Sequence, residues 1–575
     1  MFLPTTKKEL SHLGWDTLDI ILVTGDAYID SPFIGVAIIG KALMDKGFKV
    51  GIIAQPDMNA PDDITRLGEP CLFWGITGGC VDSMVANYTA LKKRRKQDDY
   101  TPGGINDKRP DRAVIAYANL VRKYFKQPCP IVLGGIEASL RRIAHYDFWS
   151  NKIRRSILFD AKADYLLFGM AHKTVIQLAH ALQAHQSPED IKGLAYISKQ
   201  AAGIPLPSFE DVQKDKKAYI SSFHLFYQNN DPISAQQICQ KHTDRYIVLN
   251  PPQPYSTTRE LDHLHALGYE RDLHPFYKKE GSVRALDTIR FSIPVHYGCY
   301  GECNFCAISV HQGRTVRSRS EASILDEAKA ISNLPDFKGY ITDLGGPTAN
   351  MYGFECKIKL RHGACKDKRC LFPNACKNLE PDHSRQISLI RQIEQLPGIK
   401  KVFISSGIRY DLILNDKKNK TAYLKKIISD NVSGQMKIAP EHTQPHVLKL
   451  MGKQDTRSLL EFKQIFDEFS KKAGKKQFLT YYMIAAHPGC RAEDMEELKQ
   501  FASRELKIQP EQVQIFTPSP STYSTLMYYT GLDPFTLAPV FVEKSAHGKE
   551  KQKKLLTNKE KQGTRSKTQP KYKKK

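Results

Sequence analysis

The chain has 575 residues, of which 41% are hydrophobic and 25% are charged. This composition is that of a globular protein with a large core, and it excludes a wholly disordered chain. The 85 basic and 61 acidic residues give a formal net charge of +24, which indicates acidic partners, with nucleic acid first among them. The excess is uneven, because residues 541–575 hold 13 Lys or Arg against three Asp or Glu.

The start of the chain lacks a secretory pattern, because Pro4, Lys7 and Lys8 interrupt any apolar run. No stretch of 18 apolar residues occurs, so we expect no membrane contact. We expect a cytoplasmic protein, whose thiols stay reduced. Seven of the 12 cysteines lie between residues 299 and 376. In a reducing compartment such a group indicates metal binding or catalysis rather than disulfides.

Residues 1–200 alternate short apolar runs with helical patterns. After the run at 18–23, apolar residues recur at helical spacing until Gly47, and a second run begins at Val50. Strands that alternate with helices predict an α/β fold with a doubly wound parallel sheet, whose ligands lie at the carboxyl ends of the strands. The expected strands are 18–23, 50–53, 71–74, 130–133 and 165–168.

Three further parts follow along the chain. Residues 201–285 contain several prolines and weaker patterning, so we expect a connector with some helix. Residues 286–530 hold six strand-like runs with helical patterns between them, which suit a whole or partial parallel (β/α) barrel. Residues 531–575 form a basic tail without apolar periodicity, and we expect it to be disordered. The expected barrel strands are 289–293, 339–342, 401–405, 434–438, 478–483 and 513–516.

The most specific motif is formed by Cys299, Cys303 and Cys306, which follow the first expected barrel strand with C-x3-C-x2-C spacing. Soft thiolates select iron–sulfur clusters, zinc or copper. In a [4Fe–4S] cube, three cysteines leave one iron open to a small molecule. A structural zinc would need a fourth ligand, which His296 or His311 would supply. The motif stands at a strand's carboxyl end, where barrel active sites lie.

This motif, with an aromatic residue before its third cysteine, resembles the signature of the radical S-adenosylmethionine (radical SAM) superfamily. The resemblance implies a [4Fe–4S] cluster on the three cysteines and S-adenosylmethionine (SAM) bound beside it. The turns that follow the later expected strands resemble the superfamily's SAM-binding turns, and they occur in the same order along the chain. In the superfamily a Glu in one of these turns binds the amino group of SAM, and this chain has Pro347 there. The residues around Pro347 would therefore have to bind the amino group.

The resemblance implies a contact for each part of SAM. The amino group would lie at Gly345, Gly346 or Thr348, and Arg409 is a candidate for the carboxylate or for an acidic substrate. The ribose would lie near Glu441 and the adenine near Pro488 and Gly489. The residues implied in SAM binding are Gly345, Gly346, Thr348, Ser406, Arg409, Glu441, Pro488 and Gly489.

At a narrower level the chain resembles the YgiQ family of radical SAM proteins, over nearly all residues up to about 531. The stretches that carry this are 134–142, 343–353, 406–411, 439–442 and 514–518. The resemblance implies an enzyme that cleaves SAM reductively and abstracts hydrogen, with an electron donor such as flavodoxin or ferredoxin. It implies no particular substrate.

A second cysteine group has the spacing C-x8-C-x4-C-x5-C. Its members are Cys356, Cys365, Cys370 and Cys376, in a stretch rich in Lys, Arg and Gly. Four thiolates can complete a closed tetrahedral site, so the group predicts a zinc site or an auxiliary iron–sulfur cluster. Separate free thiols are the alternative.

A doubly wound domain before a radical SAM barrel resembles the cobalamin-dependent branch of the superfamily. Many cobalamin domains supply an axial histidine from an Asp-x-His-x-x-Gly loop, and the equivalent stretch 26–35 contains no histidine. The domain then either binds cobalamin without that ligand or has another role.

Two functions from different classes therefore stand beside each other. The first is a radical SAM enzyme of unknown substrate, for which RNA or ribosome modification would account for the positive charge. The second is a non-enzymatic protein whose metal sites hold a basic surface for nucleic acid. Turnover of SAM separates the two.

Overall fold

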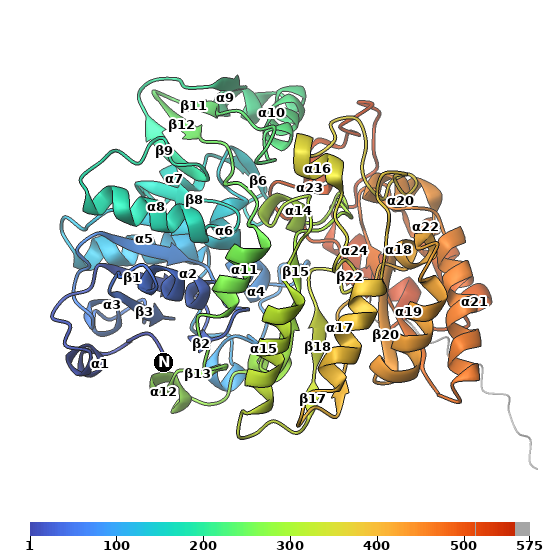
Figure 1. Ribbon diagram of the computed structural model, residues 1–575. Coiled ribbons are helices and arrows are strands. Elements are labelled where there is room, and N and C mark those ends of the chain that lie inside the picture. The colour runs from blue at the N-terminus through green and yellow to red at the C-terminus, as the bar shows by residue number, and fades with distance from the viewer. Residues whose placement is uncertain (512, 558–575) are drawn as a thin grey trace, which may run out of the picture.

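The computed structural model describes residues 1–511 and 513–557. Figure 1 shows two α/β parts side by side, one coloured blue to green and the other yellow to red. Within the described residues, none of the helices combines the length and apolarity that crossing a membrane requires.

The amino-terminal part is organised around one large sheet, with nine strands among the described residues. Five neighbouring strands run parallel in the order β3-β1-β4-β5-β8, which is the flavodoxin-like doubly wound order. The doubly wound prediction is therefore confirmed. The parallel strands are β1 (Ile20–Thr24), β3 (Val50–Ala54), β4 (Phe73–Thr77), β5 (Ile131–Gly134) and β8 (Tyr165–Leu167).

Helices cover both faces of this sheet. α2 (Gly35–Met44) and α8 (His172–Gln183) pack on one face, and α3 (Asp62–Thr65) and α5 (Ala113–Tyr124) pack on the other. Strands buried on both faces must be apolar throughout, and β1 and β3 are buried at every residue. The carboxyl edge of the parallel strands therefore stays open as the place for a ligand.

The expectation of a connector over 201–285 is wrong for its first half. Three strands between residues 204 and 249 extend the same sheet beyond the antiparallel strand β9 (Leu194–Ser198). A short hairpin brings Ile238 opposite Leu249, and the non-local pairing of Ile247 with Ile197 joins this hairpin to the sheet. These strands are β10 (Ile204–Leu206), β11 (Ile238–His242) and β12 (Arg245–Leu249), accompanied by α9 (Phe209–Lys214) and α10 (Lys216–Gln228).

Residues 250–291 lead to the second part. They contain α11 (Thr258–His265), the short strand β13 (Asp272–Leu273), which pairs with β2 (Ile29–Asp30), α12 (Pro275–Lys278) and α13 (Arg284–Ile289). The pairing of β13 with β2 fixes this segment to the amino-terminal part.

The second part is an open arc of parallel strands, as the prediction of a partial (β/α) barrel requires. β14 pairs with β18, β17 with β19, and β20, β21 and β22 follow in order. A single bridge between Ile408 and Ile438 joins the second group to the third. The strands are β14 (Ser292–Pro294), β17 (Tyr340–Ile341), β18 (Asp343–Gly345), β19 (Lys401–Val402), β20 (Gln435–Glu441), β21 (Phe478–Ala485) and β22 (Val513–Ile515).

Amphipathic helices cover the outer face of this arc in Figure 1 and share one apolar core with its strands. Their inward side chains, such as Ile390 and Phe462, are fully buried. Because the helices occupy the outside, the strand ends and their loops are free to build the site. The helices are α15 (Glu321–Ser332), α17 (Ser384–Glu394), α18 (Tyr410–Asn415), α19 (Lys420–Lys426), α21 (Arg457–Lys472) and α22 (Ala492–Phe501).

The expectation of a disordered tail is wrong for residues 531–557. α24 (Ala546–Thr557) packs against α22 and β22, and its Gln552 and Leu556 are buried. The low apolar content of the tail does not predict this helix, because two or three well-placed side chains are enough to pack one face of a helix against the protein. The rest of the predicted tail, 558–575, lies outside the described residues.

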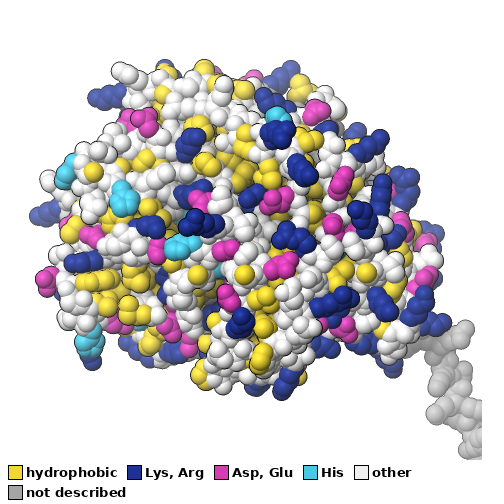
Figure 2. Space-filling model, in the orientation of Figure 1, with side chains coloured by type: hydrophobic (Ala, Val, Ile, Leu, Met, Phe, Trp, Pro, Cys, Tyr) yellow, Lys and Arg dark blue, Asp and Glu magenta, His cyan; other side chains and the backbone are white. Residues whose placement is uncertain are grey.

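Charge on the surface is mixed. On the face in Figure 2, Lys and Arg side chains lie over both parts and are interspersed with Asp and Glu. This face therefore shows no single basic patch of the kind that a nucleic-acid-binding surface displays.

Candidate active site

The loop that carries Cys299, Cys303 and Cys306 follows β14 and β15 (His296–Tyr297) and leads into α14 (Ile308–His311). A Cβ built on Gly301 would lie 3.2 Å from the Cys299 sulfur and 3.6 Å from the Cys303 sulfur. Both thiols therefore turn toward the same point of the backbone. Burial, and then the neighbouring Cys303 and Cys299 thiols, raise the pKa of Cys306 to about 12. Cys306 follows within one turn, since its backbone N–H donates to the Cys303 carbonyl at 3.0 Å, so the loop gathers all three cysteines.

These sulfurs suit an iron–sulfur cluster better than a single ion. Among the described residues, no three His, Cys, Asp or Glu side chains are arranged to hold one metal ion. In a cluster each cysteine binds a different iron, so the sulfurs need not meet at one point. Three converging thiols on one loop fit a [4Fe–4S] cluster, and Cys299, Cys303 and Cys306 would hold it.

The loop is held from outside by neighbouring elements. Asn304 donates its backbone N–H to the Met451 carbonyl at 2.9 Å and its side-chain amide to the Leu450 carbonyl at 2.8 Å. These carbonyls end α20 (Pro445–Met451). On the other side, Lys359 pairs with Glu302 at 2.7 Å, and both side chains are buried. The cysteine backbone is therefore fixed before any cofactor binds.

Arg409 places a positive charge beside the thiols. Its Nη1 lies 3.5 Å from the Cys303 sulfur, and its guanidinium pairs with Asp411 at 2.5 Å. Burial by itself lowers the pKa of Arg409, but the Asp411 carboxylate outweighs it and raises the pKa above its ordinary value. The sequence singled out Arg409 but not its partner, because the pairing depends on how α18 begins.

The turn after β18 reaches the same place. The Thr348 hydroxyl lies 3.8 Å from the Cys299 sulfur. A Cβ on Gly346 would lie 2.6 Å from the His296 ring, so only glycine fits there. Ser406 lies next to Gly345, but its hydroxyl donates to Asp343, which also accepts the Ser406 backbone N–H at 3.0 Å. Ser406 therefore holds the two strand ends together.

Glu441 comes from the end of β20, where the ladder with β21 shifts register. Its φ of +70° is rare for a residue with a side chain and indicates a conformation that the surroundings impose. Burial raises the pKa of Glu441, while Lys453 at 3.6 Å and Arg409 oppose the shift. The carboxylate thus lies within the electrostatic field of Arg409, and its contact with the ribose of SAM stays a prediction.

Pro488 and Gly489 form the turn after β21. Gly489 has a φ of +91°, and its N–H donates to the Phe541 carbonyl at 2.7 Å. Ala486 donates its N–H to Gln552 of α24 at 2.8 Å. The segment expected to be a disordered tail therefore covers this turn. His487, between them, lies 6.3 Å from the Phe305 ring of the cysteine loop, measured between centroids.

The second cysteine group is brought together only in part. Cys356 and Cys370 are buried in one small apolar cluster with Tyr300, and Cys376 packs against it. Cys365 instead lines a cavity with Lys366 and Arg369. Among the described residues the four thiols are not arranged around one ion, and a zinc site here stays a prediction. An auxiliary cluster stays a prediction.

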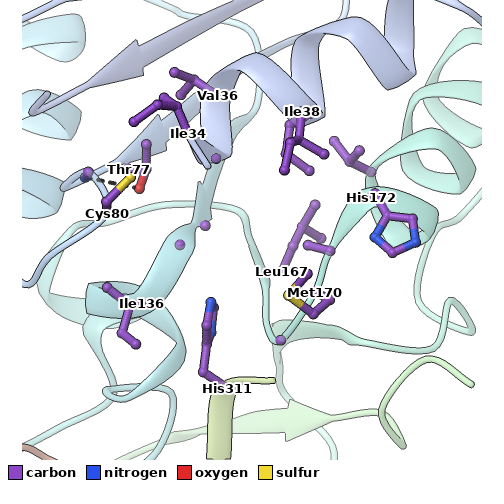
Figure 3. A pocket seen from close by; sticks show the side chains of 18 of the residues that line it. Ile34, Val36, Ile38, Thr77, Cys80, Ile136, Leu167, Met170, His172 and His311 are labelled. Carbon is purple, nitrogen blue, oxygen red and sulfur yellow. Dashed lines mark hydrogen bonds between the residues drawn. The ribbon is translucent and has the colours of Figure 1, made fainter. Parts of the chain in front are cut away.

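A cavity of about 540 Å³ lies between the carboxyl edge of the doubly wound sheet and the cysteine part. His311 points into it from α14, opposite Ile38 of α2 and Leu167 of β8 (Figure 3). The sequence analysis expected a ligand at this edge of the sheet but not the second wall, because that wall comes from the other part of the chain. The stretch 26–35 forms one wall and offers no histidine. Cobalamin at this edge therefore stays a prediction.

Comparisons with known proteins agree with this geometry. The family described as Radical SAM N-terminal matches residues 2–292, and the Radical SAM superfamily matches residues 293–502. A UPF0313 protein of Fusobacterium nucleatum is 57% identical and aligns with 97% of this chain and 99% of its own length. The chain belongs to the UPF0313 family, which is the YgiQ family of radical SAM proteins. The predicted YgiQ membership is confirmed.

Other comparisons are consistent with this. A UPF0313 protein of Thermotoga maritima is 48% identical over 98% of this chain and 99% of its own. Among solved structures, the radical SAM methyltransferase TsrM of Kitasatospora setae aligns with 88% of this chain and 75% of its own. Its TM-score is 0.49 at 13% identity, so nothing further is drawn from it.

Membership of the YgiQ family decides between the two classes of function. The chain is a radical SAM enzyme, and a [4Fe–4S] cluster and SAM are its cofactors. The non-enzymatic alternative is thereby set aside. A radical SAM enzyme needs a reductant and a substrate.

Proposed function

We propose that this YgiQ-family enzyme cleaves SAM reductively at the Cys299–Cys306 loop and abstracts a hydrogen atom from its substrate. Cys299, Cys303 and Cys306 would hold the cluster, which when reduced would supply one electron for cleavage of the sulfur–C5′ bond of SAM; methionine would leave, and the 5′-deoxyadenosyl radical would take the hydrogen atom. The observation that carries the proposal is the convergence of three thiols with Arg409 and Glu441 at one set of strand ends.

The chain's own groups would bind and orient SAM. Arg409, held by Asp411, presents further N–H donors that suit a carboxylate. Glu441 offers carboxylate oxygens to ribose hydroxyls, and Gly345, Gly346 and Thr348 surround the place for the amino group. The turn at Pro488 and Gly489 would lie against the adenine. Buried surroundings exclude water, which protects a reactive species from side reactions.

The test is SAM cleavage by anaerobically reconstituted protein reduced with dithionite or with flavodoxin. We expect brown protein with bound iron and sulfide, and release of 5′-deoxyadenosine. Cys303→Ala should abolish release, because the cluster loses one of its three ligands. The matched control is Cys71→Ala, since Cys71 is exposed in the amino-terminal part. Colourless protein with no release, or release that survives Cys303→Ala, would refute the proposal.

A further inference from the structure

The cavity between the two parts reaches one edge of the predicted SAM site, at the turn after β18. Gly346 and Pro347, from the turn after β18, line it together with His296. The opposite wall is the carboxyl edge of the doubly wound sheet, including Thr77 and Gly135. A molecule in this cavity therefore touches the turn at which the amino group of SAM is proposed to lie.

We propose that this cavity is the substrate pocket and that it takes an uncharged, largely apolar small molecule with one hydrogen-bonding head group. The assignment rests on the proposed function, because it makes the substrate a neighbour of SAM. Its volume of about 540 Å³ lies within the range of about 300–1,000 Å³ typical of small-molecule sites.

The lining excludes a charged ligand. Among the described residues that form the walls there is no Lys or Arg. The one carboxylate, Asp26, pairs with the buried Arg109 at 2.8 Å and accepts the Cys80 N–H at 2.6 Å. A phosphate or carboxylate in the cavity would lose its water without gaining a cation, which is costly. The positive charge of the chain therefore serves something other than this pocket.

One end of the cavity is an apolar slot inside the amino-terminal part. Leu22, Phe73 and Val132 form the sheet side of the slot, and Ile38 of α2 and Val175 of α8 form the helix side. The slot runs between the sheet and its covering helices, so it suits a hydrocarbon chain or an aromatic ring. Burying apolar ligand surface here is favourable.

The other end holds two histidines whose ring nitrogens make no hydrogen bond, His296 at both nitrogens and His311 at Nδ1. His311 is half-buried, its buried Nδ1 makes no hydrogen bond, and its ring points into the cavity (Figure 3). Burial, followed by the nearby Arg142, lowers the pKa of His311 to about 4, so the ring is neutral at pH 7. A neutral imidazole donates from one nitrogen and accepts at the other. It therefore suits a hydroxyl, carbonyl or amide head group.

The experiment fills the slot and compares two matched substitutions. Ile38→Trp adds bulk on the helix side of the slot, and Ile115→Trp makes the same change on α5, which covers the opposite face of the sheet. Val175→Phe fills the slot from α8. It tests the same prediction independently, in case Ile38→Trp does not fold. Circular dichroism establishes that each variant is folded.

The first readout uses the neutral dye Nile red, whose emission rises in apolar sites. Wild-type protein should bind it, and Ile38→Trp and Val175→Phe should bind about tenfold more weakly, because the buried contacts are lost. Ile115→Trp should match wild type. Equal binding by all four proteins would overturn the assignment of the pocket.

The second readout is stimulation of SAM cleavage by cell fractions. An organic-solvent extract should raise 5′-deoxyadenosine release by wild type and Ile115→Trp but not by the filled variants. Stimulation by the nucleic-acid fraction instead would overturn the proposal. So would stoichiometric binding of hydroxocobalamin that the filled variants lose, because the cavity would then belong to a corrinoid. Wild-type protein that cleaves no SAM at all would refute the proposed function, whatever the dye shows.

Discussion

Arg409 shows how one residue depends on another that the sequence does not mark. Its guanidinium lies next to the Cys303 sulfur, and Asp411 fixes its plane through both carboxylate oxygens, at 2.9 Å to Nε and 2.5 Å to Nη2. A planar guanidinium can bond Asp411 on one edge and a second anion on the other. This geometry makes Arg409 the group proposed to meet the SAM carboxylate.

We expect Arg409→Lys to weaken SAM binding by about tenfold to a hundredfold, since it removes a charge-assisted pair of hydrogen bonds. Iron content should not change, because Arg409 is not a cluster ligand. Equilibrium dialysis with SAM and an iron assay measure the two effects. Arg457→Lys, at an exposed pair with Asp455, is the control. Wild-type SAM affinity in Arg409→Lys would remove this residue from the site.

At the scale of elements, Glu327 of α15 joins the linking segment to the barrel. It pairs with Arg271 just before β13 and with Arg319 at 2.5 Å, and His265 of α11 lies 3.2 Å away. Burial by itself raises the pKa of Glu327, but Arg319 and Arg271 outweigh it and lower the pKa to about 2 from its ordinary 4.5. The carboxylate is therefore charged in the fold and paired on two sides.

This pairing predicts an acid-sensitive stability. The stabilisation is complete above pH 4.5 and is lost as the pH falls toward 2, by about 3 kcal/mol in all. Glu327→Gln should lower the free energy of unfolding at pH 7 by about 3–5 kcal/mol, because two buried arginines lose their partner. It should also flatten the pH dependence between 4.5 and 2. Denaturant unfolding over a pH series measures both.

The control lies on the same helix. Asp326 pairs with Lys329 at 3.2 Å, but both side chains are largely exposed. Asp326→Asn should change stability by no more than about 1 kcal/mol. If the two variants behaved alike, the buried network would not be what holds the linking segment to the barrel.

Helix α24 packs against the barrel, although the sequence predicted no structure there. Leu556 is fully buried in the barrel core, while Leu555 is only partly buried against it. Leu556→Ala should destabilise the protein by about 2–5 kcal/mol, and Leu555→Ala by clearly less, because only the first leaves a cavity. Thermal unfolding separates the two. Equal, small effects would mean that α24 adds little to the barrel.

At the scale of the whole molecule, part of the net charge lies beyond α24. Residues 558–575 carry eight Lys or Arg and one Glu. A chain that ends at Thr557 should cleave SAM like the full chain but bind polyuridylate more weakly. The slope of log affinity against log salt should shrink, by about 0.7 for each cation that no longer contacts phosphate. An unchanged slope would place the polyanion contacts on the folded part.

Local patterns in the sequence determined several features by themselves. The doubly wound class of the first sheet and the (β/α) character of the second part follow from alternation of apolar runs and helices, because buried parallel strands must be apolar. The cluster cysteines follow from spacing, because three thiols on eight residues of one loop cannot lie far apart. Family resemblance adds the strand-end turns in their correct order.

Only the tertiary structure decided which distant residues meet. Residues 204–249 join the sheet, α24 covers the turn at Pro488, and His311 faces the same cavity as Leu22 and Ile38. Separation along the chain carries no information about distance beyond a turn or two. These contacts depend on how two separately patterned parts pack together, and the proposed substrate pocket lies where they do.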